Sequence, residues 1–178
     1  LTAGAEDVAI DLLAGRGDIL NTNSSAAITA VGTVQMQAQA GNIGNAATIA
    51  SGTGADVLLT ADGNIVNSGA IGSGRLVSFA AGSNISNTAA ITAVDSITMT
   101  AGNDINNSDM LTAGSSVILT AGNDIGNTAA ITAAEAITME AASDITSDGT
   151  LTAVKDVQLI ADGGNTVSYT HLRAHETL

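Results

Sequence analysis

Apolar residues recur in this chain at a fixed interval of 20 residues. Three columns of branched aliphatic side chains keep that interval over five successive units. The columns are Ile71, Ile91, Leu111, Ile131 and Leu151; Val77, Ile97, Val117, Ile137 and Val157; and Ile65, Ile85, Ile105, Ile125 and Ile145. Self-similarity at such a period indicates a repeat architecture, in which each unit packs against its neighbours.

The repeat extends upstream with small insertions and deletions. Units begin at Leu1, Ile28 and Ile49, and the third column continues through Ile19 and Ile43. About eight units therefore cover residues 1–167. Because the first unit is already under way at Leu1, we expect the chain to be a segment of a longer array.

Apolar and polar residues alternate within each unit, as in residues 97–101, Ile-Thr-Met-Thr-Ala. A period of two indicates a β-strand with one buried face. Each short strand is followed by Gly-Asn-Asp, as at residues 102–104 and 122–124, and this composition tolerates the positive φ of a sharp corner. The predicted fold is all-β, a right-handed parallel β-helix (solenoid) of about eight 20-residue coils.

Composition agrees with a solenoid and excludes several functions. The chain has no Pro, which suits a sheet in which nearly every N–H donates, and no Cys, which excludes disulfides and thiolate chemistry. Its formal net charge of −13 disfavours nucleic acid as a partner. No apolar run approaches the length of about 18 residues that spans a bilayer, so we expect no membrane insertion.

Asparagine follows the third column by two residues in six units. The positions are Asn21, Asn45, Asn67, Asn87, Asn107 and Asn127, and Ser147 takes this place in the next unit. Stacked in register, side-chain amides can hydrogen-bond along a rod, so we predict a structural Asn ladder. A second column, Thr92, Thr112, Thr132 and Thr152, is expected to face outward. Ligand binding is the alternative for both columns.

Three carboxylates form the sharpest candidate for a metal site. Asp104, Asp124 and Asp144 occupy one corner column, where oxygen ligands in a row can hold Ca²⁺. However, Asn64 and Asn84 occupy the same corner in earlier units, and the Gly-Gly-x-Gly-x-Asp repeat of calcium-binding β-rolls is absent. The column is therefore a weak calcium candidate, and we predict that the chain has no metal or other cofactor.

Catalytic chemistry has no support in the repeats. A β-helix enzyme that acts on carbohydrate needs a cluster of carboxylates or basic groups on one face, which these units lack. A Ser-His-Asp triad would need a His within residues 1–167, where none occurs. The Gly-rich residues 72–75 lack the Gly-Lys-Ser/Thr ending of a phosphate-binding loop and indicate a loosened corner. We predict that the chain is not an enzyme and has no catalytic residue.

The repeat pattern stops at Ser168. Residues 168–178 contain the only Tyr and both His, and the string resembles translated sequencing-adaptor read-through. His171 and His175 have the spacing of a zinc-binding helix, but Leu172 stands where that motif has its Glu, and no third ligand is evident. We interpret the segment as a non-repeat tail, disordered or artefactual.

Units such as residues 111–127, with Leu-Thr-Ala-Gly at the start and Thr-Ala-Gly-Asn-Asp-Ile-Gly-Asn at the end, resemble the repeats of filamentous haemagglutinin. The resemblance covers nearly the whole chain. It implies a two-partner secretion exoprotein, either an adhesin or the shaft of a contact-dependent growth inhibition protein, exported through an outer-membrane transporter to the bacterial cell surface. The Asn-Pro motifs of the secretion domain and the Val-Glu-Asn-Asn sequence before a toxin domain are missing, so we expect the chain to come from the middle of such a protein.

Two functions follow from this resemblance. The leading hypothesis is a passive shaft segment that projects a distal functional domain. The alternative is a direct adhesin whose exposed Thr and Asn columns bind glycans or a receptor on host or neighbouring cells. A calcium-binding solenoid and a carbohydrate-active β-helix enzyme are weaker alternatives.

Overall fold

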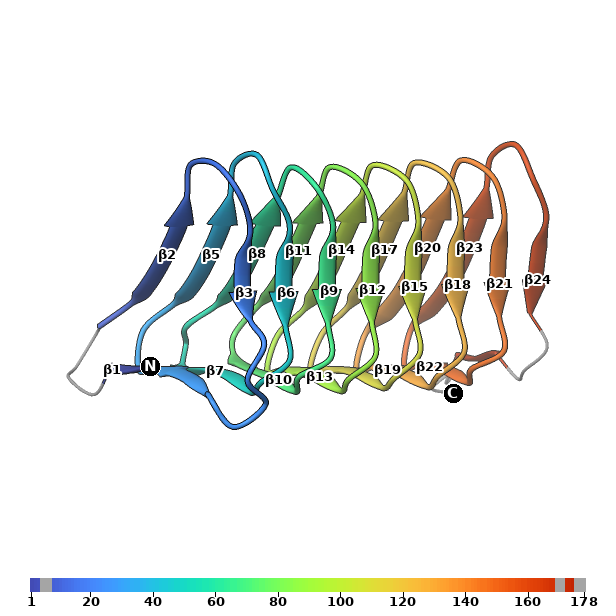
Figure 1. Ribbon diagram of the computed structural model, residues 1–178. Coiled ribbons are helices and arrows are strands. Elements are labelled where there is room, and N and C mark those ends of the chain that lie inside the picture. The colour runs from blue at the N-terminus through green and yellow to red at the C-terminus, as the bar shows by residue number, and fades with distance from the viewer. Residues whose placement is uncertain (4–7, 169–171, 175–178) are drawn as a thin grey trace.

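The computed structural model describes residues 1–3, 8–168 and 172–174, and in this part of the chain it is a parallel β-solenoid (Figure 1). Strands from successive coils form three parallel sheets, two with eight strands and one with nine. The described residues form no helix, so there is no membrane-spanning helix among them. The predicted all-β solenoid of about eight coils is confirmed.

Each coil contributes one short strand to each sheet, in the order A, B, C. Sheet A contains β1 (Thr2–Ala3), β4 (Ile28–Ala30), β7 (Ile49–Thr53), β10 (Ile71–Gly74), β13 (Ile91–Ala93), β16 (Leu111–Ala113), β19 (Ile131–Ala133), β22 (Leu151–Ala153) and β25 (Leu172–Ala174). Sheet B contains β2 (Ile10–Ala14), β5 (Val34–Ala38), β8 (Val57–Ala61), β11 (Val77–Ala81), β14 (Ile97–Ala101), β17 (Val117–Ala121), β20 (Ala136–Ala141) and β23 (Asp156–Ala161). Sheet C contains β3 (Ile19–Asn21), β6 (Ile43–Asn45), β9 (Ile65–Asn67), β12 (Ile85–Asn87), β15 (Ile105–Asn107), β18 (Ile125–Asn127), β21 (Ile145–Ser147) and β24 (Thr166–Ser168).

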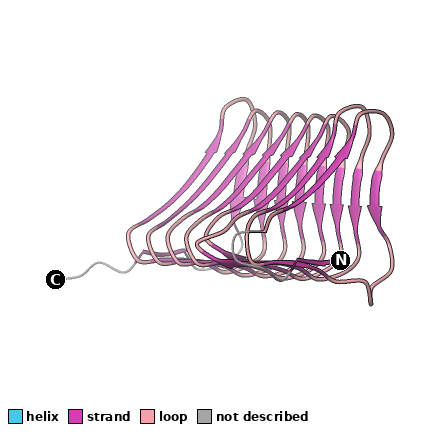
Figure 2. Cartoon of the chain, turned by 90° about the vertical axis from the view of Figure 1, so that its left-hand side faces the viewer, coloured by secondary structure: helices cyan, strands magenta, loops and turns pink. Residues whose placement is uncertain are grey.

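Equivalent residues of successive coils are register partners. Ile91 pairs with Leu111 and Leu111 with Ile131, so the first aliphatic column lies along the axis of the stack as predicted. The same holds for sheets B and C, where Ile97 pairs with Val117 and Ile105 with Ile125. Figure 2, turned by 90°, shows strands following one another along the stack, with loops at the corners.

The core is a set of aliphatic columns between the three sheets. Alternation sends every second strand residue inward, so the strands from Ile97 and Val117 have buried first, third and fifth residues. The only Phe of the chain, Phe79, is fully buried in the middle column of sheet B, with Leu59 and Met99 as its register partners. Aliphatic residues thus fill most of the core, and the single Phe replaces Leu or Met in one coil.

Insertions lie mainly at corners, and in the third coil they also lengthen β7 and shift its register with β10. The Asn at the end of the sheet C strand returns after 24 residues from Asn21 and after 22 from Asn45, and then after 20 residues from Asn67 onward. In the first coil the extra residues form a turn closed by Ala26 N–H, which donates to Asn23 O at 2.8 Å. In the third coil they include Gly54, whose φ is 74°.

The corner glycines have a different role from the one that the sequence indicates. Gly102 and Gly122 do not have a positive φ; instead, a Cβ at either position would lie 2.1 Å from the carbonyl oxygen of the equivalent residue in the preceding coil. Glycine therefore lets successive corners approach closely. Where Ala142 occupies the column, its N–H bond to Ala121 O lengthens to 3.3 Å, against 3.0 Å for Gly122 N–H to Ala101 O.

Removal of one whole coil, residues 91–110, should leave a folded rod that is about 4.8 Å shorter, because coils contact only their neighbours and the columns re-form across the junction. Removal of residues 91–100 should abolish cooperative unfolding, because the remaining half coil cannot fill all three sheets. Small-angle scattering and thermal circular dichroism measure the two outcomes. Equal stability of the two deletions would contradict the stacking.

Substitution Ile105→Asp should lower the free energy of unfolding by about 3 to 5 kcal/mol, because it places an unpaired carboxylate in the core. Ile105 is fully buried, whereas its neighbour Asn106 is exposed on the outer face. The matched substitution Asn106→Asp should change stability by only about 0.5 kcal/mol. Urea unfolding of both variants checks the inward direction of the third column.

Candidate functional site

A column of buried amides runs along the ends of the sheet C strands. In the first five members, Nδ2 donates to Oδ1 of the Asn in the next coil at 2.8 or 2.9 Å. The members are Asn21, Asn45, Asn67, Asn87, Asn107 and Asn127, and Asn127 Nδ2 donates to Ser147 Oγ at 3.3 Å. All six residues of the predicted ladder are therefore brought together, and we call this set the Asn ladder.

The same amides also close the corner that follows sheet C. Asn87 Nδ2 donates a second bond to Ala89 O at 2.8 Å, and Asn107 and Asn127 bond in the same way to the carbonyls two residues on. The inner members are at most 2% exposed, and no buried side-chain polar atom of the described residues lacks a partner. The amides are thus occupied within the fold and shielded from a ligand in solution.

A second polar column lies at the corner between sheets B and C, immediately before each sheet C strand. In each coil the Oδ1 atom of an Asp or Asn accepts the backbone N–H of the equivalent residue in the next coil, at 2.7 to 3.2 Å. The accepting residues are Asp18, Asn42, Asn64, Asn84, Asp104, Asp124 and Asp144. We call this column the corner ladder.

The corner ladder accounts for the carboxylates that the sequence offers as a calcium column. Asp104, Asp124 and Asp144 lie above one another, and each uses one carboxylate oxygen to accept a backbone N–H, a bond that the negative charge strengthens. In the described part of the chain, no group of three or more His, Cys, Asp or Glu residues is placed to hold a metal. The geometry supports a structural use of these oxygens, and the absence of a metal, with calcium as the weak alternative, stays a prediction.

Sequence reasoning missed the corner ladder, although the sequence carries its signal. Asp or Asn precedes every third-column Ile, from Asp18 before Ile19 to Asp144 before Ile145. Asp and Asn are interchangeable there because either side chain supplies the Oδ1 acceptor. A column that mixes the two residue types is typical of hydrogen bonding to the backbone rather than of a charge-dependent site.

The outer faces of sheets A and C carry little charge. On sheet A, Thr92, Thr112, Thr132 and Thr152 are register partners that face outward and are exposed or half-buried, as expected for the Thr column. The outward column of sheet C contains Leu20, Gly44, Val66, Ser86, Asn106, Gly126, Thr146 and Val167. Both faces are neutral over these positions, so the acidic residues concentrate mainly at the corners.

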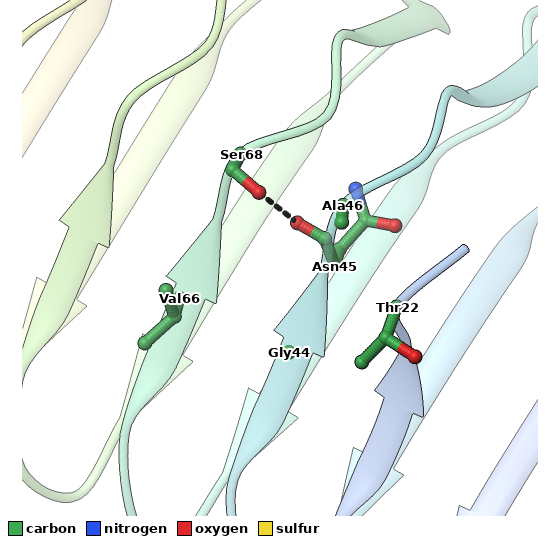
Figure 3. Close-up of a pocket in the computed structure, with 6 residues that line it drawn as sticks. All are labelled: Thr22, Gly44, Asn45, Ala46, Val66 and Ser68. Atoms are coloured by element: carbon green, nitrogen blue, oxygen red, sulfur yellow. Dashed lines mark hydrogen bonds between the residues drawn. The ribbon is translucent and has the colours of Figure 1, made fainter. Parts of the chain in front are cut away.

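An open groove of about 170 Å³ lies on the outer face of sheet C, where Gly44 leaves a gap between neighbouring side chains (Figure 3). Thr22, Asn45, Ala46, Val66 and Ser68 complete its lining. Ser68 Oγ donates to the Asn45 carbonyl oxygen at 3.3 Å, which occupies its hydroxyl. The groove therefore offers apolar surface and contains no carboxylate, imidazole or other group for acid–base catalysis.

Two ion pairs lie at the corner between sheets A and B. Arg75 Nη2 contacts Asp56 Oδ2, and Lys155 Nζ lies 2.8 Å from Glu135 Oε1. The hydrogen bond from Lys155 lowers the pKa of Glu135, assisted by a bond from Ser115 and by the positive charge of Lys155. Arg75 belongs to the Gly-rich residues 72–75, where a register irregularity between Gly72 and Gly74 agrees with the loosened corner predicted from the sequence.

The predicted tail, residues 168–178, lies largely outside the described residues. Its two histidines, His171 and His175, are both outside them. Ser168 ends β24, and residues 172–174 form β25, which pairs with β22. The boundary at residue 168 and the origin of the tail stay predictions.

A comparison with protein families matches the haemagglutinin repeat over residues 1–69, 72–138 and 124–173. Together these three matches cover nearly the whole chain. Comparisons with curated proteins and with solved structures found no match.

Substitution Asn107→Ala should lower the free energy of unfolding by about 2 to 4 kcal/mol, because it leaves Asn87 Nδ2 without its acceptor and Asn127 Oδ1 without its donor. Asn107→Ser should cost less, since a hydroxyl already serves at Ser147. The exposed neighbour Asn106 supplies the control, Asn106→Ala, with an expected change of about 0.5 kcal/mol or less. Similar urea midpoints for Asn107→Ala and Asn106→Ala would exclude a stabilising ladder.

Proposed function

The chain belongs to the haemagglutinin repeat family, and from this premise we propose that it is a segment of the rigid shaft of a large secreted bacterial surface protein. The family is one of structural and adhesin proteins and is associated with two-partner secretion. In this role the segment projects a distal adhesive or toxic domain away from the cell. It works by its length and stiffness and carries out no reaction.

The observation that carries this proposal is the unbroken stacking of coils along one axis. Every strand from β4 to β22 in sheet A has a parallel partner on both sides, and sheets B and C continue in the same way. Each added coil lengthens such a rod by one strand spacing, about 4.8 Å, without changing its cross-section. A spacer needs a length that grows in proportion to the number of coils.

The use of polar groups also supports a spacer. The Asn ladder and most of the corner ladder bond within the fold, and the groove at Gly44 has an apolar lining. Binding sites usually hold a few convergent polar groups that fix a ligand's orientation. The formal net charge of −13 also suits a long secreted rod, because net charge keeps such a rod soluble.

A direct adhesin is the second candidate. The Thr column of sheet A supports it, because Thr92 and Thr132 are exposed and their hydroxyls recur at a regular spacing that can match repeated hydroxyl groups of a glycan. The glycan or receptor would then lie along the side of the rod. The two candidates differ in whether the isolated chain binds anything.

A glycan array probed with the labelled full chain separates these candidates. The shaft proposal expects no glycan bound above the background of a scrambled-sequence peptide, together with small-angle scattering of a rod of constant cross-section. Glycan binding that disappears in a variant with Val at all four Thr positions, Thr92, Thr112, Thr132 and Thr152, would establish the adhesin instead. The four side chains face outward and Val is β-branched like Thr, so this variant removes the hydroxyls while it keeps the preference for strands.

A further inference from the structure

The regular coils are nearly interchangeable, which creates a problem of register. From β13 to β22 the aliphatic core columns repeat every 20 residues with only Ile, Leu, Val or Met exchanged. A coil that stacked on the wrong neighbour, with the coil between them extruded as a loop, would still align similar side chains. The core columns and the Asn ladder therefore distinguish poorly between correct and shifted stacking.

Asp56 breaks this degeneracy at the junction of the third and fourth coils. It is the charged residue among the buried polar side chains, and its side chain is 11% exposed. Its carboxylate contacts the Arg75 guanidinium and accepts the Leu76 N–H at 3.1 Å, both from the next coil. A buried carboxylate is costly unless it is paired, so Asp56 needs the Arg75 guanidinium, which reaches it from the residue beside its register position.

Three of the four residues that would take the place of Arg75 after a shift lack its positive charge, and the fourth, Lys155, would require a shift by four coils. Backbone hydrogen bonds link the corner column from coil to coil, and its members are Arg75, Asp95, Ser115, Glu135 and Lys155. A shift by one coil would place Asp95 over Asp56, and a shift by three would place Glu135 there. Each of these two shifts would bring two carboxylates together. A shift by two coils would place the neutral Ser115 beside Asp56.

We propose that the charges along the corner between sheets A and B specify which coil stacks on which. The Asp56–Arg75 pair stabilises the native junction, and repulsion between Asp56 and Asp95 destabilises the nearest shifted junction. Charged residues select partners in this way in other repetitive assemblies. The Glu135–Lys155 pair lies at the junction of the seventh and eighth coils, and because both side chains are exposed it adds a weaker preference there. The two pairs lie at the two ends of the regular coils, whose cores distinguish register poorly.

Disulfide trapping on the outer face of sheet B tests this proposal, because the chain has no Cys of its own. Thr60 pairs with Ala80 and Ala80 with Thr100 in the native register. The double substitution Thr60→Cys/Ala80→Cys therefore reports native stacking. Thr60→Cys/Thr100→Cys reports a shift by one coil, because these positions are natively about 9.6 Å apart, beyond the reach of a disulfide, about 7 Å between Cα atoms.

Each reporter is combined with charge variants in the full chain, refolded from urea at low concentration and then oxidised. In the double variant Arg75→Asp/Asp95→Arg, which keeps the net charge, the favourable pair belongs to the shifted register. We expect the fraction of disulfide between positions 60 and 100 to rise at least about tenfold over the native charge pattern. Arg75→Gln removes the native ion pair without creating a shifted one, so it should raise the fraction of this disulfide by a smaller factor. Arg75→Lys keeps the positive charge and should leave that fraction unchanged.

Glu140→Gln is the matched control, since Glu140 is an exposed charge on sheet B away from this corner. It should leave the fraction between positions 60 and 100 unchanged. A fraction that stays at the native level in both Arg75→Gln and the swapped variant would overturn the proposal. If the swapped variant does not refold, as judged by circular dichroism, Arg75→Gln decides the question by itself.

Discussion

Parallel, in-register pairing between successive coils is the interaction on which the rest of the structure depends. Because Ile91 lies next to Leu111 and Leu111 next to Ile131, each aliphatic column is continuous along the axis and each strand can donate and accept on both sides. Pairing with identical neighbours also explains the short strands, since every sheet continues in the next coil and cohesion does not depend on strand length.

The same rule governs the polar residues. A buried amide is tolerated because the equivalent amide of the next coil is always in reach, and an Asp at a corner meets a backbone N–H for the same reason. A single buried polar side chain would lack a hydrogen-bond partner and would destabilise the fold. When the same residue recurs in each coil, each copy has its partner in the next coil and stabilises the stack. The exception is the junction at Asp56 and Arg75, where the bonding depends on two residues that differ from their column neighbours.

The sequence is sufficient to predict the solenoid, the register of the columns and the membership of the Asn ladder, because these follow from a period and from alternation. The role of Gly102 and the bonding of Asp104 were not predictable in this way. Both depend on how closely corners approach each other and on which atom a side chain meets in the next coil. The partnership of Asp56 with Arg75 also depends on an inserted corner whose path includes a positive φ at Gly54. Periodicity describes what coils share, so it says least about the places where they differ.

The placement of extra residues mainly at corners has a consequence for how such a chain can diverge. The first coil accommodates a longer excursion before β4, with its turn at Asn23, while the strands on either side keep their partners. Surface loops can therefore drift in length and composition without disturbing the interior. A family built this way can vary the length and sequence of its exposed corner loops while its members keep the same cross-section.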